Sequence, residues 1–535
     1  MSNVMEKIKK NKKNILNVLM IIFYILNMYM YYNKLTAKVS VGMLSKILYL
    51  ILTFLLFLIF TIVLKKINKE KEYKPEKLFL IFAISFGIVY LFATPLFKGH
   101  DEQYHWQKAY AISELKFVPK MDDYWAGHIG LCDYIPNVAE KIYTKQDNFE
   151  KITYKSEIKS YIYAMYCQIK NEDYEIIPVL DAPTAYYPAV QMLPQSMGIL
   201  VAKLLGFNML FEAIFARLFN FIAYLVLGYF SIKLLPSCKY FLAAFLLCPK
   251  VMYISTTISG DVFTNSVIIF YISYIFYLIK RDQKITKKDI AILCVLEPLV
   301  AINKLVYLPL CFLILLIPSK LFKDKKGNRI FKILLCIFAL IVSLSWLKIS
   351  SSFLKTTDPS TSKQISYIMH NPITYTKTVV VQFFKNLKEW SIDIVGGYME
   401  WGNAFKQKDI ISIYVYIVLI LALLFEKNKA NIRKTHKIFT LLIFLAVTVL
   451  IETALYIQWS PRFEGIGGPN IYGVQGRYFT PILLLVALIL SNNFKAIDKI
   501  FEKLKINNKF DFYTFSYLII LWQIPTILSI FVRNI

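Results

Sequence analysis

Residues 43–64 read MLSKILYLILTFLLFLIFTIVL, with Lys46 as the single charged side chain. A membrane-spanning helix needs about 20 mostly apolar residues, and this stretch meets that length. Lys65 and Lys66 follow it directly, as basic residues often do where a helix leaves the bilayer on the cytoplasmic side. The stretch therefore predicts a transmembrane helix, and the same pattern recurs along the chain.

Apolar runs of similar length divide the rest of the sequence. Together they predict an all-α polytopic membrane protein with about thirteen transmembrane helices. Residues 289–317 form either two short helices or one helix kinked at Pro298, with Asn303 and Lys304 at the break. The expected spans are 15–32, 43–64, 78–96, 209–232, 240–257, 262–279, 289–302, 304–317, 330–349, 410–425, 437–457, 477–493 and 512–532.

The composition excludes several other classes of protein. Of the 535 residues, 57% are apolar and 18% are charged, whereas a soluble domain has about 45–50% apolar and about a quarter charged residues. A soluble enzyme, a disordered protein and a secreted disulfide scaffold do not fit. The net charge of +27 comes from lysine clusters between apolar runs, which is typical of cytoplasmic loops. We therefore expect the lipid bilayer as a partner, and no nucleic acid.

The basic clusters set the expected orientation. All six clusters can face the cytoplasm if residues 186–206 form an interfacial or re-entrant helix that does not span. The clusters lie at 7–13, 65–77, 280–288, 320–329, 427–437 and 495–509. The N-terminus is then cytoplasmic, the first span is an uncleaved anchor, and residues 97–208, 260–261, 350–409 and 458–476 lie outside. Because lysine greatly outnumbers arginine, we infer an AT-rich bacterial genome and expect a bacterial cytoplasmic membrane.

The loop after the third span has the composition of a soluble segment. It contains Cys132 and Cys167, which either form a disulfide in an oxidising compartment or remain free thiols. This loop and the runs around it suggest four parts: anchor helices with a cytoplasmic loop (1–77), a membrane core (78–349) that includes the extracytoplasmic loop 97–208, a second outer loop (350–409) and C-terminal helices (410–535).

The first candidate constellation is DEQYH, residues 101–105, just past the third span. On a helix, Asp101 and His105 share a face. A carboxylate here can accept a proton from a hydroxyl group, and Asp101, Glu102 and His105 can together bind a divalent cation such as Mg²⁺ or Mn²⁺. The alternative is an ordinary polar loop, because acids often begin helices.

Two further constellations lie at later outer turns. In Ser259-Gly260-Asp261, the aspartate either caps the following helix or faces the same site as Asp101. GVQGRY, residues 473–478, contains two glycines. Because glycine has no side chain, an anion can approach the backbone N–H groups there. Arg477 can hold a phosphate through two parallel hydrogen bonds, although arginines at interfaces also bind lipid headgroups.

Several ionisable groups fall inside the expected spans. Charge in hydrocarbon is costly, so such groups usually pair with one another or line a cavity. No sequence motif of soluble nucleotide hydrolases, serine hydrolases, zinc proteases or dinucleotide-binding enzymes is present. The intramembrane groups are Glu212, Arg217, Glu297, Lys304 and Glu452.

The order of these motifs resembles the DUF2142 family of bacterial and archaeal membrane proteins. The resemblance runs from about residue 78 to about residue 490. The sequence departs from the family pattern at Gln103 and Tyr104 inside DEQYH and at Trp106 after its histidine. The matching residues are Pro95, Asp101-Glu102 with His105, Tyr187-Pro188, Ala216-Arg217-Leu218, Ser259-Gly260-Asp261, Lys304, Tyr307, Pro309 and Gly473 to Phe479.

The family looks like a branch of the GT-C glycosyltransferases, which use polyprenyl-phosphate sugars outside the cytoplasmic membrane. The resemblance implies transfer of a sugar to a cell-envelope glycan or lipid acceptor. It implies catalytic roles for Asp101, Glu102 and Asp261, and substrate-binding roles for a second set: His105, Arg217, Lys304, Gln475, Arg477 and Tyr478.

Two other functions fit the same charges. A transporter or flippase of lipid-linked glycans also needs intramembrane charge, but it is expected to show repeated halves with broken helices, which the sequence lacks. A non-catalytic protein of envelope assembly would tolerate the loss of Asp101, Asp261 and Arg477 together.

Overall fold

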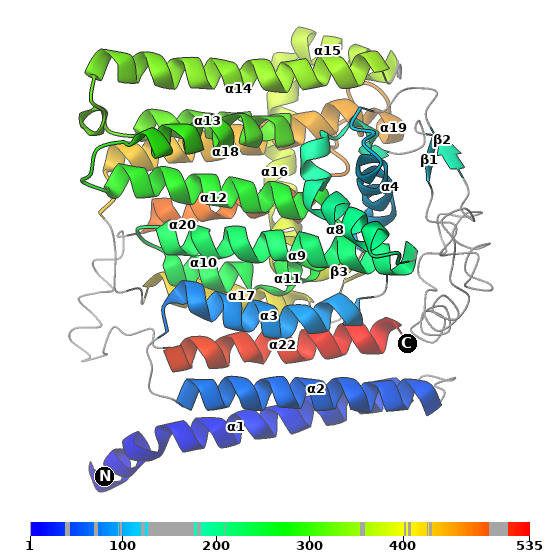
Figure 1. Ribbon diagram of the computed structural model, residues 1–535, viewed down its shortest axis with the longest axis vertical. Coiled ribbons are helices and arrows are strands. Elements are labelled where there is room, and N and C mark those ends of the chain that lie inside the picture. Colours follow the sequence, from blue (N-terminus) through cyan, green and yellow to red (C-terminus); the bar gives the residue numbers. More distant parts are fainter. Residues whose placement is uncertain are drawn as a thin grey trace.

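The computed structural model is a bundle of long, nearly parallel helices (Figure 1). Two short antiparallel strand pairs, β1 with β2 and β3 with β4, are departures from the all-α expectation. The structure describes residues 2–37, 43–68, 73–94, 96, 99–118, 124–126, 176–178, 183–207, 209–353, 359–400, 403–404, 408–424, 426, 431–491 and 512–534. Most of the predicted loop 97–208, with Cys132 and Cys167, lies outside these residues.

The described elements follow one another in this order: α1 (Ser2–Thr36), α2 (Met43–Asn68), α3 (Pro75–Ala93), α4 (Glu102–Ser113), β1 (Tyr124–Ala126), β2 (Ile176–Pro178), η3 (Pro183–Tyr186), η4 (Ala189–Met192), α8 (Leu193–Leu204), α9 (Met209–Leu234), α10 (Lys239–Leu246), α11 (Pro249–Ser255), α12 (Gly260–Lys280), α13 (Lys287–Asn303), η5 (Leu305–Leu316), η6 (Ser319–Leu321), α14 (Lys325–Phe353), α15 (Pro359–His370), α16 (Pro372–Val395), β3 (Tyr398–Glu400), β4 (Asn403–Ala404), α17 (Lys408–Leu424), α18 (Lys434–Gln458), α19 (Pro461–Glu464), η7 (Gly476–Ile482), α20 (Leu483–Leu490) and α22 (Phe512–Asn534). The η elements are 3₁₀ helices.

Among the described residues, seven helices are long and apolar enough to cross a membrane. They correspond to seven of the thirteen expected spans, and the protein is therefore a multi-pass membrane protein. The seven segments are Ser45–Ile62, Pro75–Ala93, Leu210–Leu234, Gly260–Lys280, Gly327–Ser351, Lys434–Gln458 and Phe515–Val532.

Of the remaining apolar runs, 15–32 lies within the 35-residue helix α1, and the others form shorter helices or broken pairs. The run at 240–257 divides into α10 and α11, because Pro249 begins a new helix after the extended Cys248. The run at 289–317 is two helices, α13 and η5, separated at Lys304, whose backbone is extended. Pro298 lies inside α13 and does not end it.

Residues 186–206 do not form a spanning helix. They contain the short 3₁₀ helix η4 and the 12-residue helix α8, which is too short to cross about 30 Å of hydrocarbon. Helix α8 packs against α9 and α4, near one end of the bundle (Figure 1). This agrees with the expectation of a helix that does not span.

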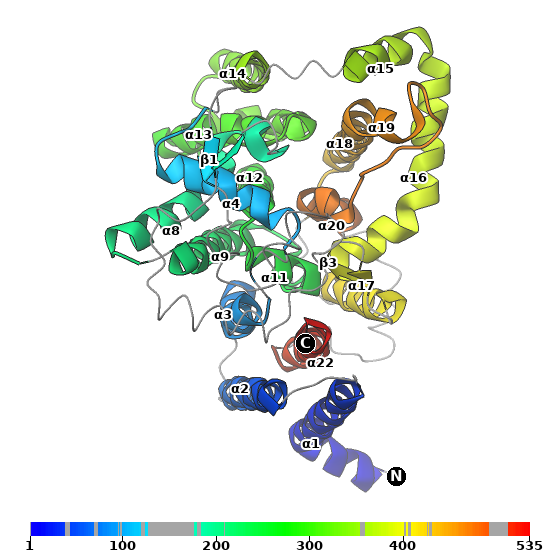
Figure 2. The same cartoon turned by 90° about the vertical axis from the view of Figure 1, so that its right-hand side faces the viewer.

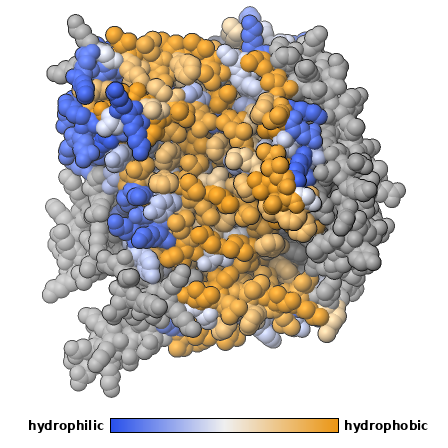
Figure 3. All heavy atoms as spheres, viewed as in Figure 1, coloured by the Kyte–Doolittle hydropathy of each residue, from blue (hydrophilic) through white to orange (hydrophobic). Residues whose placement is uncertain are grey.

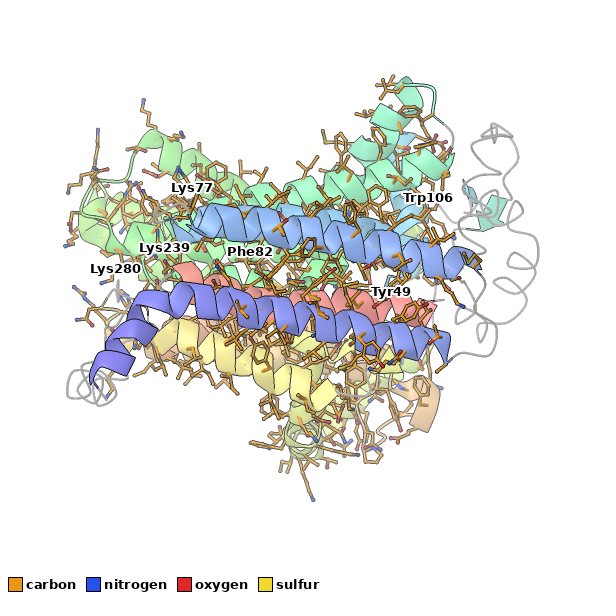
Figure 4. All side chains as sticks on the ribbon, turned by 90° about the horizontal axis from the view of Figure 1, so that it is seen from below. Tyr49, Lys77, Phe82, Trp106, Lys239 and Lys280 are labelled. Atoms are coloured by element: carbon orange, nitrogen blue, oxygen red, sulfur yellow. The ribbon has the colours of Figure 1, made fainter. Side chains whose placement is uncertain are left out.

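The two ends of the bundle carry different side chains. Lys77, Lys239 and Lys280 lie toward one end, whereas Trp106 of α4 lies toward the other (Figure 4). Between the ends, apolar residues form a broad band on the surface (Figure 3). Because α12 runs from Gly260 to Lys280, Asp261 lies at the end opposite to the lysines.

Candidate functional site

Four charged side chains meet at this end of the bundle. Nη2 of Arg477 lies 2.7 Å from Oδ2 of Asp101, and Nη1 lies 3.4 Å from Oδ2 of Asp261. Nζ of Lys304 lies 2.5 Å from Oδ1 of Asp261. Residues from three turns and one helix break, far apart in the sequence, thus form one network of alternating charge.

Asp101 is the accessible member of this network. It precedes α4 with a left-handed backbone (φ 56°, ψ 21°), a conformation that aspartate tolerates better than most residues. Its side chain makes no hydrogen bond that caps α4, because the carboxylate turns to Arg477. The side chain is 29% exposed, against 3% for Arg477, so Asp101 is the acid that an incoming molecule meets first.

Asp261 does not cap α12. The cap is Ser259, whose hydroxyl oxygen accepts the N–H of Asp261. This leaves the Asp261 carboxylate to Lys304 and Arg477. The capping alternative considered from the sequence is therefore wrong for Asp261, because the residue two positions earlier takes that role.

Lys304 reaches the network because α13 ends beside it. The extended backbone at Lys304 separates α13 from η5, and the side chain points between two tyrosines. Its Nζ lies 5.7 Å from the ring centre of Tyr187 and 5.0 Å from that of Tyr478, distances at which a ring face attracts a cation. Tyr478 therefore contacts the site through its ring, while its carbonyl oxygen accepts the hydroxyl of Tyr307.

Arg477 has unused hydrogen-bond donors. Within the part of the chain that the structure describes, its buried Nε and Nη1 have no acceptor with hydrogen-bond geometry. A buried donor without an acceptor costs about 1–3 kcal/mol. An anion with two oxygen atoms would satisfy Nε if it bound the Nε–Nη2 edge in place of Asp101, because that edge of the guanidinium matches phosphate or carboxylate.

Glu102 and Arg217 form a separate, buried pair. Arg217 donates from Nε to Oε1 of Glu102 at 2.7 Å and from Nη2 to Oε2 at 2.8 Å. The same carboxylate accepts the N–H groups of Ile258 and Gly99. Arg217 also donates to the carbonyl of Thr94 at the end of α3. These bonds fasten three segments together, so the pair supports the site rather than facing a ligand.

His105 lies on the same side of α4 as Asp101, as its spacing predicts. Its ring is buried and lies 5.9 Å from that of Tyr187. Burial lowers the pKa of His105 to about 4, although Asp261 and Asp101 act in the opposite direction. Burial likewise raises the pKa of Tyr187 to about 12. Both side chains are therefore neutral near pH 7.

A second network behind Arg477 was missed by the sequence reasoning. Lys250 is fully buried, and its Nζ lies 2.8 Å from Oδ1 of Asp393. The other oxygen of Asp393 accepts the N–H of Gly476 at 2.7 Å. The sequence did contain a signal for this network, because Lys250 is a charged residue inside an apolar run. The Gly476 N–H is thus engaged within the protein, which corrects the expectation that it faces an anion.

Gln475 precedes this glycine and has a buried Oε1 without a hydrogen-bond partner among the described residues. Three further predicted intramembrane groups lie away from the charge network. Glu297 and Glu452 are buried, and both carboxylate oxygens of Glu452 lack a hydrogen-bond partner among the described residues. Glu212 is also buried, near the start of α9. The structure does not bring these acids together with Asp101.

Asp101, Glu102 and His105 do not fit a divalent cation. Glu102 is fully engaged by Arg217 and two backbone N–H groups, and Asp101 is held by Arg477. Across the described residues, no group of three or more His, Cys, Asp or Glu side chains is placed to bind a metal ion. The positive charges beside the acids come from Arg477 and Lys304.

Comparison with known proteins identifies a family. The family model described as "Predicted membrane protein (DUF2142)" matches residues 84–486, about three quarters of the chain. No curated protein matches the chain, and no solved structure matches it. The matched range includes Asp101, Asp261, Lys304 and Arg477. The chain therefore belongs to the DUF2142 family of membrane proteins.

Proposed function

We propose that this protein is a GT-C-like glycosyltransferase that moves a sugar from a polyprenyl-phosphate donor to a cell-envelope glycan or lipid. The observation that supports this most directly is the contact between Asp101, an accessible carboxylate, and Arg477, a buried guanidinium whose Nε has no hydrogen-bond acceptor among the described residues. A proton acceptor and a phosphate ligand thus lie within one hydrogen bond of each other, at one end of an apolar bundle.

We also propose the orientation of the chain. Basic residues mark the cytoplasmic side of a membrane protein, and Lys77, Lys239 and Lys280 lie at the end opposite to Trp106 (Figure 4). The N-terminus and these lysines then face the cytoplasm of a bacterial cell, and the site faces outside. About thirteen crossings follow if α10–α11, α13–η5, α17, η7–α20 and the apolar part of α1 cross the membrane as well.

Arg477 and Lys304 bind the donor phosphate in this mechanism. Phosphate oxygens accept from Nε of Arg477, which lacks an acceptor among the described residues, and from the adjacent Nη2, which Asp101 occupies when no donor is bound. The phosphate competes with Asp101 for the guanidinium, and the freed carboxylate turns toward the acceptor. Because the network holds two acids and two cations, an added anion is most readily accommodated by releasing the more exposed acid, Asp101.

The transfer step needs one base and one leaving-group ligand. Asp101 accepts the proton of the acceptor hydroxyl, and that oxygen attacks the anomeric carbon. The bond between the anomeric carbon and the phosphate oxygen breaks, and polyprenyl phosphate leaves with the negative charge. Arg477 and Lys304 stabilise this charge at the membrane boundary. The configuration at the anomeric carbon inverts, and no metal ion is required by these residues.

The test uses the purified full-length protein in liposomes with radiolabelled polyprenyl-phosphate sugars and envelope acceptors. Asp101→Asn is expected to keep the fold and lose transfer, because the amide cannot accept the proton. Arg477→Lys is expected to weaken donor use through the loss of the bidentate contact. The matched control is Lys116→Gln, which changes an exposed lysine beyond α4.

The outcome separates the rival functions. Normal glycan transfer by Asp101→Asn would refute the assignment of the base. If donor supplied in one leaflet only is moved to the other leaflet without sugar transfer, the protein is a flippase instead. If Asp101, Asp261 and Arg477 can all be replaced without effect on the envelope, the protein is not catalytic.

A further inference from the structure

Helices α15 and α16 were expected to belong to an outer loop, residues 350–409. The structure shows instead that α16 is a 24-residue helix that runs across the bundle. Figure 1 shows it nearly perpendicular to α12, α13 and α14, and Figure 2 shows it lengthwise while α14, α3 and α22 are seen along their axes. A helix in this direction lies parallel to the membrane plane.

Contacts at the C-terminal end of α16 fix its depth along the bundle. Asp393 accepts the N–H of Gly476 and pairs with Lys250. The rings of Trp390 and Phe479 lie 5.1 Å apart. These contacts place α16 at the depth of Arg477, at the outer ends of the membrane helices.

One side of α16 packs on the protein. Val379 and Trp390 are buried there. A neighbouring stripe is apolar but bare: Ile373 is 85% exposed and Phe384 is 69% exposed. The stripe continues along one side of α16 at helical spacing. Its members are Ile373, Val380, Phe384 and Leu387, which we call the α16 stripe.

Lysines lie beside the stripe. At 100° per residue, Lys377 and Lys388 fall within about a quarter turn of Ile373. Lys385 falls further round, where its Nζ contacts Asn470 of the outer loop, 3.1 Å away. A helix with a bare apolar side and lysines along its polar side is typical of segments that lie in the headgroup region of a bilayer.

Exposed apolar surface elsewhere in the protein supports the same occupant. Helix α14, which is long enough to span, exposes Ile333, Leu334 and Phe338 to a similar degree. Those side chains can only face lipid in a membrane-spanning helix. The α16 stripe is also exposed and apolar, but its helix runs nearly perpendicular to α14 (Figure 1).

We propose that α16 lies in the outer lipid–water interface. The α16 stripe is buried among the upper acyl chains, and Lys377 contacts phospholipid phosphate groups, whereas Nζ of Lys388 lies 3.3 Å from Oδ1 of Asp409. This inference does not rest on the proposed transferase activity, because it concerns where the helix lies and what covers it.

The C-terminal end of α16 contacts the backbone of Gly476, the residue before Arg477. A Cβ atom on Gly476 would lie 2.5 Å from the carbonyl oxygen of Trp390 and 2.8 Å from the nitrogen of Ile394. The end of α16 and the loop before Arg477 are therefore in direct contact, so the depth of α16 bears on the depth of Arg477.

The test places an environment-sensitive fluorescent amino acid at position 384 of the full-length protein in phosphatidylcholine–phosphatidylglycerol vesicles. The matched control carries the probe at position 385, one residue along the same helix but on the side of Asn470. Phospholipids with brominated acyl chains quench probes in the bilayer, and iodide quenches probes in water. A probe at position 380 repeats the measurement if the 384 variant does not fold.

We expect bromolipid to quench the probe at 384, with blue-shifted emission, and iodide to quench the probe at 385. Quenching at 384 by iodide and not by bromolipid would overturn the inference, because the stripe would then face water. Protection of 384 from both quenchers would also overturn it, because a second copy or another protein would then cover the stripe. Each readout is independent of sugar transfer.

Discussion

Asp101 and Glu102 are adjacent acids, yet their replacement should have opposite consequences. Glu102 is fully buried and accepts four hydrogen bonds, two from Arg217 and one each from Gly99 and Ile258. In Glu102→Gln the amide nitrogen must face donors, and Arg217 loses its counter-charge. Removing one partner of a buried ion pair costs about 3–5 kcal/mol, a large part of the roughly 5–15 kcal/mol that holds a protein folded.

Asp101→Asn removes an ion pair whose acid is 29% exposed, so water can replace part of the contact, and the loss should be smaller than for the fully buried Glu102. Arg477 keeps Asp261 as a neighbour in that variant. Thermal unfolding in detergent, followed by size-exclusion chromatography, should therefore show a much lower midpoint for Glu102→Gln and a smaller change for Asp101→Asn.

The double variant Glu102→Gln, Arg217→Met checks the cause of the loss. Because Arg217 has no partner charge once Glu102 is replaced, the second change should cost little more than the first, and the two losses should not add. Equal midpoints for Glu102→Gln and the parent protein would refute this account of the pair. So would a drop for Asp101→Asn as large as that for Glu102→Gln.

Three further changes test other contacts. Gly476→Ala should lower both stability and donor binding, because its Cβ would lie 2.5 Å from the carbonyl of Trp390; wild-type donor binding would contradict this packing. Ser259→Ala should cost about 1 kcal/mol through loss of the cap of α12, measured as a lower unfolding midpoint. The pKa of His105 is about 4 in the folded protein against about 6.5 in an unfolded chain, so the unfolded state binds more protons between these values. Stability should fall as the pH drops from about 6.5 to about 4, and this slope should flatten in His105→Gln.

The membrane helices follow from the sequence because the bilayer imposes length and polarity on each of them. The run at 43–64 has one charge and becomes most of α2. For residues 289–317 the sequence left two alternatives, one kinked helix or two short helices. The structure has two helices separated at Lys304. Helix α16 was not predicted, because its apolar side chains are diluted by lysine and threonine and its stripe is shorter than a membrane crossing.

The candidate residues could be named from the sequence, but their pairings could not. The residue types and outer turns pointed to Asp101, Asp261 and Arg477, and to charges that need partners in a medium of low dielectric constant. Which acid meets which cation depends on the start of α4. The backbone at Asp101 turns left-handed, which sends its carboxylate to Arg477, and the next residue, Glu102, points into the bundle toward Arg217.

The same low dielectric constant explains why the site is a network rather than a set of isolated charges. A lone Lys304 or Arg477 at the membrane boundary would lose its hydration without compensation. Each cation is therefore held by an acid, and Asp261 is shared between them. The network can take in a further anion only if one of its acids turns away. Asp261 contacts both cations and is nearly buried, so the acid that can turn away is Asp101, which has one partner and the larger exposure.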